Sequence, residues 1–133
     1  MSPSAGPTST TADADESLLL VLTTVDDEAA ADRIAQALVA ERLAACVNVL
    51  APCRSVYRWR GQIERIDERP LLIKTRASLG PALARRLAEL HPYEVPELVA
   101  WRPSDVAPAY LAWALGETGA ASGAPSGSAE PLA

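Results

Sequence analysis

The stretch VYRWRGQIERI, from Val56 to Ile66, decides the fold because it reads as a β-hairpin. Arg60 and Gly61 separate two arms rich in β-branched and aromatic residues, and glycine tolerates the positive φ that a two-residue hairpin turn demands. The second arm runs on to LLIKT, Leu71 to Thr75, so the hairpin is long. Pro70 lies inside that arm and cannot donate to a ladder, which predicts an edge or a bulge.

Three further segments have the pattern of strands. Leu18 to Leu22 (LLLVL) is a continuous apolar run, typical of a strand covered on both faces, and we place it centrally in a sheet. Ala45 to Leu50 is a strand that resumes at Cys53 to Trp59, after a bulge or bend that Pro52 predicts. Glu97 to Trp101 (ELVAW) is the last strand.

A first helix follows the first strand. Asp26 or Asp27 can cap its free N–H groups, and Ala30, Ile34, Ala37 and Leu38 recur at helical spacing as far as about Glu41.

A second helix is predicted after the hairpin, with Ser78 as its N-cap and an apolar stripe of Leu83, Leu87 and Leu90. It ends near His91, because Pro92 disfavours helical geometry in the residue before it. A short final helix spans 106–115, capped by Ser104 or Asp105.

The order β-α-β-β-α-β-α predicts an α+β fold of the ferredoxin-like type, a four-stranded antiparallel sheet with two helices on one face. The other face also needs cover. The hairpin arms carry more apolar and aromatic surface than two helices can shield, so we expect an oligomer packed through its sheets.

The ends of the chain differ from the middle. Residues 1–16 and 118–133 are rich in Ser, Thr, Ala, Gly and Pro without an apolar period, so we predict disordered tails around a folded unit at 17–117. The net charge of -5 argues against nucleic acid as a partner, and no apolar run is long enough for a bilayer span.

The chain contains two cysteines, Cys46 and Cys53, seven positions apart. An odd separation in one strand places their side chains on opposite faces unless a bulge intervenes, so we expect no bridge between them. Free thiols suit a reducing cytoplasm, where we place the protein.

Several motifs together resemble the CutA divalent-cation tolerance family: ERLAACVNV (Glu41 to Val49), YRWRGQIE (Tyr57 to Glu64), LLIKT, HPYEVPEL (His91 to Leu98) and AYLAWAL (Ala109 to Leu115). The resemblance covers nearly the whole folded unit in order. It implies a ferredoxin-like fold, a homotrimer whose hairpins cross between subunits, a cytoplasmic location, and an association with copper tolerance and copper binding.

The resemblance carries copper ligands only in part. The family's ligand positions read Thr23, Leu90 and His91 here, so His91 alone is a candidate metal ligand among them. Cys46 could also bind a thiophilic ion, but a small buried core residue is the alternative interpretation. For His91 the alternative is a helix C-cap, and for the Pro-bounded segment after it a rigid connector.

Lys74, the only lysine, lies in the strand that neighbours Glu97 in this fold, and we predict that the two pair. Either the pair is structural, or Lys74, Tyr93, Glu97, Glu64 and Trp59 line a cleft between subunits that binds a small-molecule effector. Tyr110 and Trp113 are predicted to pack in the trimer.

The sequence offers no nucleophile motif, phosphate loop or metal-hydrolase spacing, so we expect a protein that is not an enzyme. The leading hypothesis is a cytoplasmic homotrimer that serves divalent-cation tolerance with weak or absent copper binding. The alternative is a signalling trimer of the PII type that binds a small-molecule effector.

Overall fold

A computed structural model of the chain describes residues 17–119. The predicted tails were 1–16 and 118–133, of which residues 1–16 and 120–133 lie outside this range. No helix among the described residues is long and apolar enough to cross a membrane.

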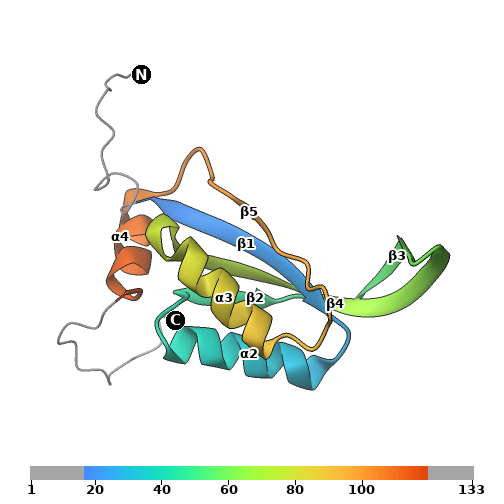
Figure 1. Cartoon of the computed structure of the whole chain (residues 1–133). Helices are drawn as coiled ribbons and strands as arrows, with labels where there is room; N and C mark the ends of the chain where they lie inside the picture. The colour runs from blue at the N-terminus through green and yellow to red at the C-terminus, as the bar shows by residue number, and fades with distance from the viewer. Residues whose placement is uncertain (1–16, 120–133) are drawn as a thin grey trace.

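The sheet is built around its longest strand (Figure 1). The strands are β1 (Leu18–Val25), β2 (Cys46–Val49), β3 (Cys53–Trp59), β4 (Gln62–Arg76) and β5 (Val99–Trp101). Their order is β2-β4-β1-β5, and β3 pairs with the part of β4 that β2 leaves free. Every pairing is antiparallel, which confirms the predicted ferredoxin-like arrangement.

Two helices cover one face of this sheet, α2 (Glu28–Ala40) and α3 (Gly80–Leu90). The odd-numbered residues of β1 and β4 point toward them, because side chains alternate along a strand. The resulting core is apolar and almost fully buried; it includes Val21, Val25, Ile34, Leu38, Leu71, Ile73, Leu83 and Leu87. The leucine stripe predicted for the second helix is therefore confirmed.

A third helix, α4 (Pro108–Gly116), packs on the even-numbered side. It covers one end of the sheet, away from the hairpin (Figure 1), where Ala114 packs with Leu18 and Ala45 in a small second cluster. The rest of this side, which we call the open face, has no cover within the described residues. Val99 and Trp101 of β5 are 51% and 42% exposed there.

The helix boundaries agree with the sequence at one cap and differ at two. Asp27 caps α2, accepting a 3.0 Å hydrogen bond from the Ala30 N–H. Ser78 was predicted to cap the second helix, but it lies in a 3-10 turn (Ala77–Leu79) and α3 begins after it. The final helix begins at Pro108 rather than near Val106, because the fixed φ of proline suits the first helical position.

The hairpin turn is as predicted. Arg60 and Gly61 have φ of 51° and 82°, the two positive values that a tight two-residue turn needs. Beyond the end of β1, opposite Arg69, the hairpin projects past the helices as an arm of two strands (Figure 1).

A bulge separates the sheet from this arm. Val49 pairs with Leu71 and Cys53 with Glu68, so residues 50–52 lie opposite only two residues of β4. The bulge confirms the interruption predicted at Pro52. It also corrects the expected faces of the thiols: Cys46 and Cys53 lie opposite Lys74 and Glu68, two even positions of β4, and both are free.

The predicted start of the C-terminal tail is too early, because Thr118 and Gly119 are packed against the domain. The Arg76 Nε donates to the Thr118 hydroxyl at 3.2 Å, and the Arg42 Nε donates to the Gly119 carbonyl at 3.2 Å. A second Arg42 nitrogen reaches the Gly116 carbonyl at 2.9 Å. Two cations at the C-terminal end of α4 favour this position of the helix through its dipole.

Two buried hydroxyls in the core generate a stability prediction. Thr23 and Thr75 are fully buried, and neither hydroxyl has a hydrogen-bond partner among the described residues. Because an unpaired buried hydroxyl opposes folding, Thr23→Val and Thr75→Val should each raise the free energy of unfolding by about 1 kcal/mol. Urea unfolding at matched protein concentration measures this change.

Thr118→Val is the matched control. The Thr118 hydroxyl is also buried, but it donates to the Ala114 carbonyl at 3.0 Å. This substitution should therefore lower the free energy of unfolding by about 1 kcal/mol. A loss of stability in the two core variants would contradict the assignment of their hydroxyls as unpaired.

Candidate functional site

His91 joins α3 to the connector that leads to β5. Its backbone N–H donates to the Leu87 carbonyl at 2.9 Å, so His91 is the C-cap of the helix, as one of the two interpretations predicted. Pro92 follows and prevents the helix from continuing. The residue is only 7% exposed, and its ring lies against the end of β1.

Both ring nitrogens of His91 form hydrogen bonds. Nδ1 accepts the Tyr93 N–H at 3.1 Å, and Nε2 donates to the Thr24 carbonyl at 2.9 Å. This is the pattern of a neutral imidazole, and burial lowers the pKa of His91 from its ordinary value. A metal ion at either nitrogen would have to replace one of these bonds, so the geometry assigns His91 a structural role.

Tyr93 links the connector to the base of the hairpin. Its hydroxyl donates to the Glu68 carboxylate at 2.6 Å, and Glu68 is almost completely buried. Burial, followed by this hydrogen bond to a carboxylate, raises the pKa of Tyr93. The pair holds the connector against β4 at the point where the arm leaves the sheet.

The tip of the hairpin returns to the same connector. An Arg60 guanidinium nitrogen donates to both oxygens of Glu94, at 3.0 and 3.2 Å, and the guanidinium also lies 5.2 Å from the centre of the Trp59 ring. This ion pair is exposed and so adds little stability by itself. Together with the Tyr93 contact, it attaches the arm to the connector at two points.

Lys74 lies on the open face, away from this junction. It stands between Cys46 on one side and Leu20 on the other, and Leu20 stands opposite Trp101. Its ammonium group is 5.8 Å from the centre of the Tyr110 ring. Tyr110 in turn packs against Trp113 within α4, with ring centres 5.4 Å apart and ring planes tilted by 44°.

The predicted pair of Lys74 and Glu97 does not form within the chain. Glu97 accepts a 3.2 Å hydrogen bond from the Thr24 hydroxyl, whereas Lys74 is level with Leu20. Four residues of β1 separate the two levels, which is about 13 Å along a strand. The prediction placed both residues on neighbouring strands, but β1 lies between them and their positions along it differ.

The five residues predicted to line one cleft fall in three places in a single copy. Tyr93 and Glu97 belong to the connector, Lys74 belongs to the open face, and Trp59 and Glu64 lie on the arm. Only contacts between copies could bring them together.

The two predicted metal ligands are also apart. Cys46 is level with Leu20 across the sheet, whereas His91 contacts Thr24 at the other end of β1. Within residues 17–119 there is no group of three His, Cys, Asp or Glu side chains that could hold one ion. Thr23 and Leu90, at the family's other ligand positions, present no soft donor.

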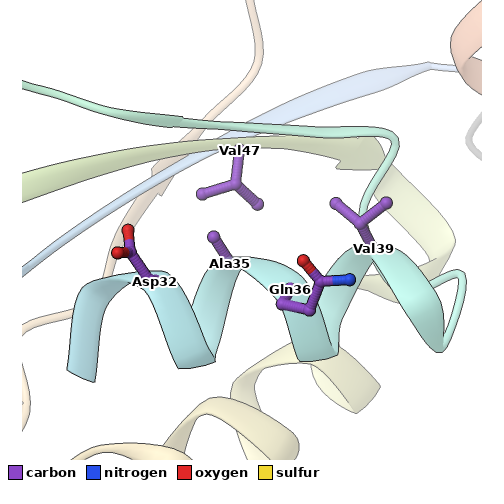
Figure 2. A pocket seen from close by; sticks show the side chains of 5 residues that line it. All are labelled: Asp32, Ala35, Gln36, Val39 and Val47. Atoms are coloured by element: carbon purple, nitrogen blue, oxygen red, sulfur yellow. The ribbon is translucent and has the colours of Figure 1, made fainter. Parts of the chain in front are cut away.

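A shallow hollow of about 340 Å³ lies elsewhere, between α2 and β2. Figure 2 shows Val47 of β2 facing Ala35 and Val39 of α2, with Asp32 and Gln36 at the rim. None of the predicted site residues lines this hollow, so it is separate from the junction around His91.

Glu68 is the site residue that sequence reasoning missed. It lies in a charged stretch of the hairpin that reads as exposed surface, and its burial depends on the connector folding over it. The only local feature that distinguishes Glu68 from the other charged residues of the hairpin is its position opposite Cys53, directly after the bulge.

The junction gives a second prediction. Tyr93→Phe should lower the free energy of unfolding by about 1–3 kcal/mol, because it leaves the buried Glu68 carboxylate without its donor. Thermal or urea unfolding with matched protein concentrations measures the loss. Tyr57→Phe, at an exposed tyrosine of the arm, is the control and should change stability by less than about 0.5 kcal/mol. Equal effects of the two substitutions would show that the Tyr93 contact contributes nothing.

Comparison with known proteins places this geometry in a family. A family model described as CutA1 divalent ion tolerance protein matches residues 19–117. The divalent-cation tolerance protein CutA of Thermus thermophilus is 46% identical over 100 residues, which cover 75% of this chain and 97% of that protein. Protein CutA of Mus musculus is 44% identical over 90 residues, 68% of this chain, and the match spans about half (51%) of that longer relative.

Solved structures of CutA proteins also resemble this fold. The crystal structure of CutA from Xylella fastidiosa superimposes with a TM-score of 0.75 at 44% identity, covering 77% of this chain and 99% of that one. The predicted resemblance is therefore confirmed over the whole sheet, the hairpin arm and the connector. The chain belongs to the CutA1 divalent ion tolerance protein family.

Proposed function

We propose that the protein serves divalent-cation tolerance as a homotrimer that packs through the open faces of its sheets. The observation that carries this proposal is the apolar open face, on which Val99 and Trp101 remain about half exposed in one copy. Each Å² of such surface removed from water contributes about 25 cal/mol, so an uncovered apolar face favours association.

The sheet edges support a ring of copies. In one copy β2 and β5 end the sheet on either side, and neither has a partner on its outer edge within the described residues. Unpaired edges invite pairing with another chain. A head-to-tail ring joins β2 of one copy to β5 of the next, so that every copy uses both edges and the assembly closes.

The ring also offers a place for the cleft between subunits. Lys74 and Glu64 have no partner of opposite charge among residues 17–119 of their own copy. We place the cleft where the arm of one copy, with Glu64 and Trp59, meets the open face of the next, with Lys74. Tyr93 and Glu97 border it through the connector, and Tyr110 and Trp113 pack beside it.

We propose that tolerance does not depend on a copper ion held within one chain. The donors that the family resemblance suggests do not fit such a site, because His91 uses both ring nitrogens and Cys46 lies at another level of the sheet. The neutral, bonded His91 also has no free nitrogen for acid-base catalysis, which favours binding over catalysis. Free Cys46 and Cys53 are compatible with a reducing cytoplasm.

Oligomeric state tests the assembly. Native mass spectra of the purified protein should show three copies, and Trp101→Glu should shift the population toward monomers because it places a charge in the apolar interface. Val39→Glu is the matched control: Val39 is exposed to a similar degree, on the helix side of the sheet, and its substitution should leave the trimer intact. A trimeric Trp101→Glu variant would contradict the use of the open face.

Growth in graded copper tests the function. A strain that lacks its own family member should regain tolerance when it expresses this chain, and a Cys46→Ser/Cys53→Ser variant should restore tolerance equally. Trp101→Glu, which breaks the assembly, should restore little. If the thiol-free variant failed while Trp101→Glu succeeded, bound copper rather than assembly would be the basis of tolerance.

A further inference from the structure

The arm has two faces of different chemistry. One face, which we call the inner face, carries Tyr57, Trp59, Glu64 and Glu68, and the Glu68 contact with Tyr93 turns it toward the connector. The outer face is made of three cross-strand pairs: Arg54 with Asp67, Val56 with Arg65, and Arg58 with Ile63.

The outer face is basic in an acidic protein. Three arginines and one aspartate give it a net charge of +2, whereas the whole chain has a formal charge of -5. Arg54 and Asp67 are 3.8 Å apart with both side chains more than 70% exposed, so they neutralise each other weakly. No carboxylate among residues 17–119 pairs with Arg58 or Arg65.

The arginines also lie close to one another. Arg65 stands opposite Val56 and diagonal to both Arg54 and Arg58, at a backbone spacing of roughly 7–8 Å. Like charges at this spacing repel, which opposes folding of the arm. The repulsion is relieved when carboxylates approach the outer face from outside the chain.

Two aliphatic side chains lie among these arginines. Val56 and Ile63 are 58% and 60% exposed, and both project from the outer face on neighbouring cross-strand pairs. An apolar centre bordered by arginine has the composition of a protein interface, in which arginine is enriched. A partner that covers the centre and supplies carboxylates at the rim would satisfy both features.

The same features disfavour other anionic partners. A nucleic acid offers phosphates but has no aliphatic group for Val56 and Ile63, and the aromatic rings that could stack on a base, Tyr57 and Trp59, lie on the inner face. A lipid surface is usually met by tryptophan or tyrosine at the headgroup level, and these are absent from the outer face for the same reason.

We propose that the outer face of the arm is a docking surface for an acidic segment of another protein, one that places an aliphatic side chain between carboxylates. The segment would lay its aliphatic group on Val56 and Ile63 and its carboxylates against Arg58 and Arg65. This proposal goes beyond cation tolerance and uses the face of the arm opposite to the one that we place in the cleft between subunits.

Binding of a defined probe tests the docking surface. Fluorescence anisotropy with the full chain and a labelled peptide of alternating glutamate and valine should detect binding that weakens as salt is raised. An Arg58→Glu/Arg65→Glu variant should weaken binding at least about 10-fold, because it replaces two attractive charges by two repulsive ones. Ile63→Ser should also weaken it, which a purely electrostatic contact would not predict.

The control variant makes an equal change in net charge on another part of the surface. Arg33 on α2 and Arg85 on α3 are exposed and have no ion pair among the described residues, so Arg33→Glu/Arg85→Glu should leave the affinity within about 2-fold of the wild type. An equal loss in this control would reduce the effect to net charge and overturn the proposal. Absence of measurable peptide binding to the wild type would also overturn it.

Two further results would reject the acidic protein segment as the partner. The first is tighter binding of an oligothymidylate, or of phosphatidylserine vesicles, than of the peptide. The second is a change in the number of copies, seen by native mass spectrometry, when Arg58 and Arg65 are replaced. That change would make the outer face an interface between copies of this chain.

Discussion

The fold depends on β4 being a single uninterrupted strand of 15 residues that belongs both to the sheet and to the arm. Its C-terminal half lies between β1 and β2 and supplies Leu71 and Ile73 to the core. Its N-terminal half continues past the end of β1 and pairs only with β3. Because side chains alternate along one strand, the faces of the arm are set by the same alternation that divides the core from the open face.

The connector after α3 completes this arrangement. A cap, a proline and two hydrogen bonds of one imidazole fix where the chain leaves the helix, and Tyr93 then meets Glu68 at the base of the arm. The histidine that first suggests a metal ligand therefore acts as a hydrogen-bonded corner. The surfaces that we propose to be functional lie elsewhere, on the open face around Lys74 and on the two faces of the arm.

Local chemistry explains which predictions succeed. The Arg60-Gly61 turn, the Asp27 cap and the leucine stripe of α3 depend on neighbours in sequence, and all three are confirmed. Ser78 fails as a cap because a 3-10 turn precedes the helix. The predicted pair of Lys74 and Glu97 fails for a different reason. The sequence pattern assigns each residue to a strand, but the position of that residue relative to the next strand depends on the register across β1, which no local pattern encodes. Glu68 and Thr118 are buried by contacts with segments that are distant in sequence. Their burial therefore cannot be predicted from the residues next to them in the chain either.

The bulge at residues 50–52 has an evolutionary meaning. In β2, before the bulge, even-numbered residues pair with even-numbered residues of β4. In β3, after the bulge, odd-numbered residues pair with even-numbered ones, as Cys53 does with Glu68. Loss of one residue from this segment would leave two residues opposite two, so the bulge would disappear while the Arg60-Gly61 turn kept Cys53 opposite Glu68 and the side chains of the arm on their present faces. The turn and β4 thus decide which chemistry each face of the arm presents, and a lineage could gain or lose a residue between β2 and β3 without exchanging the two faces.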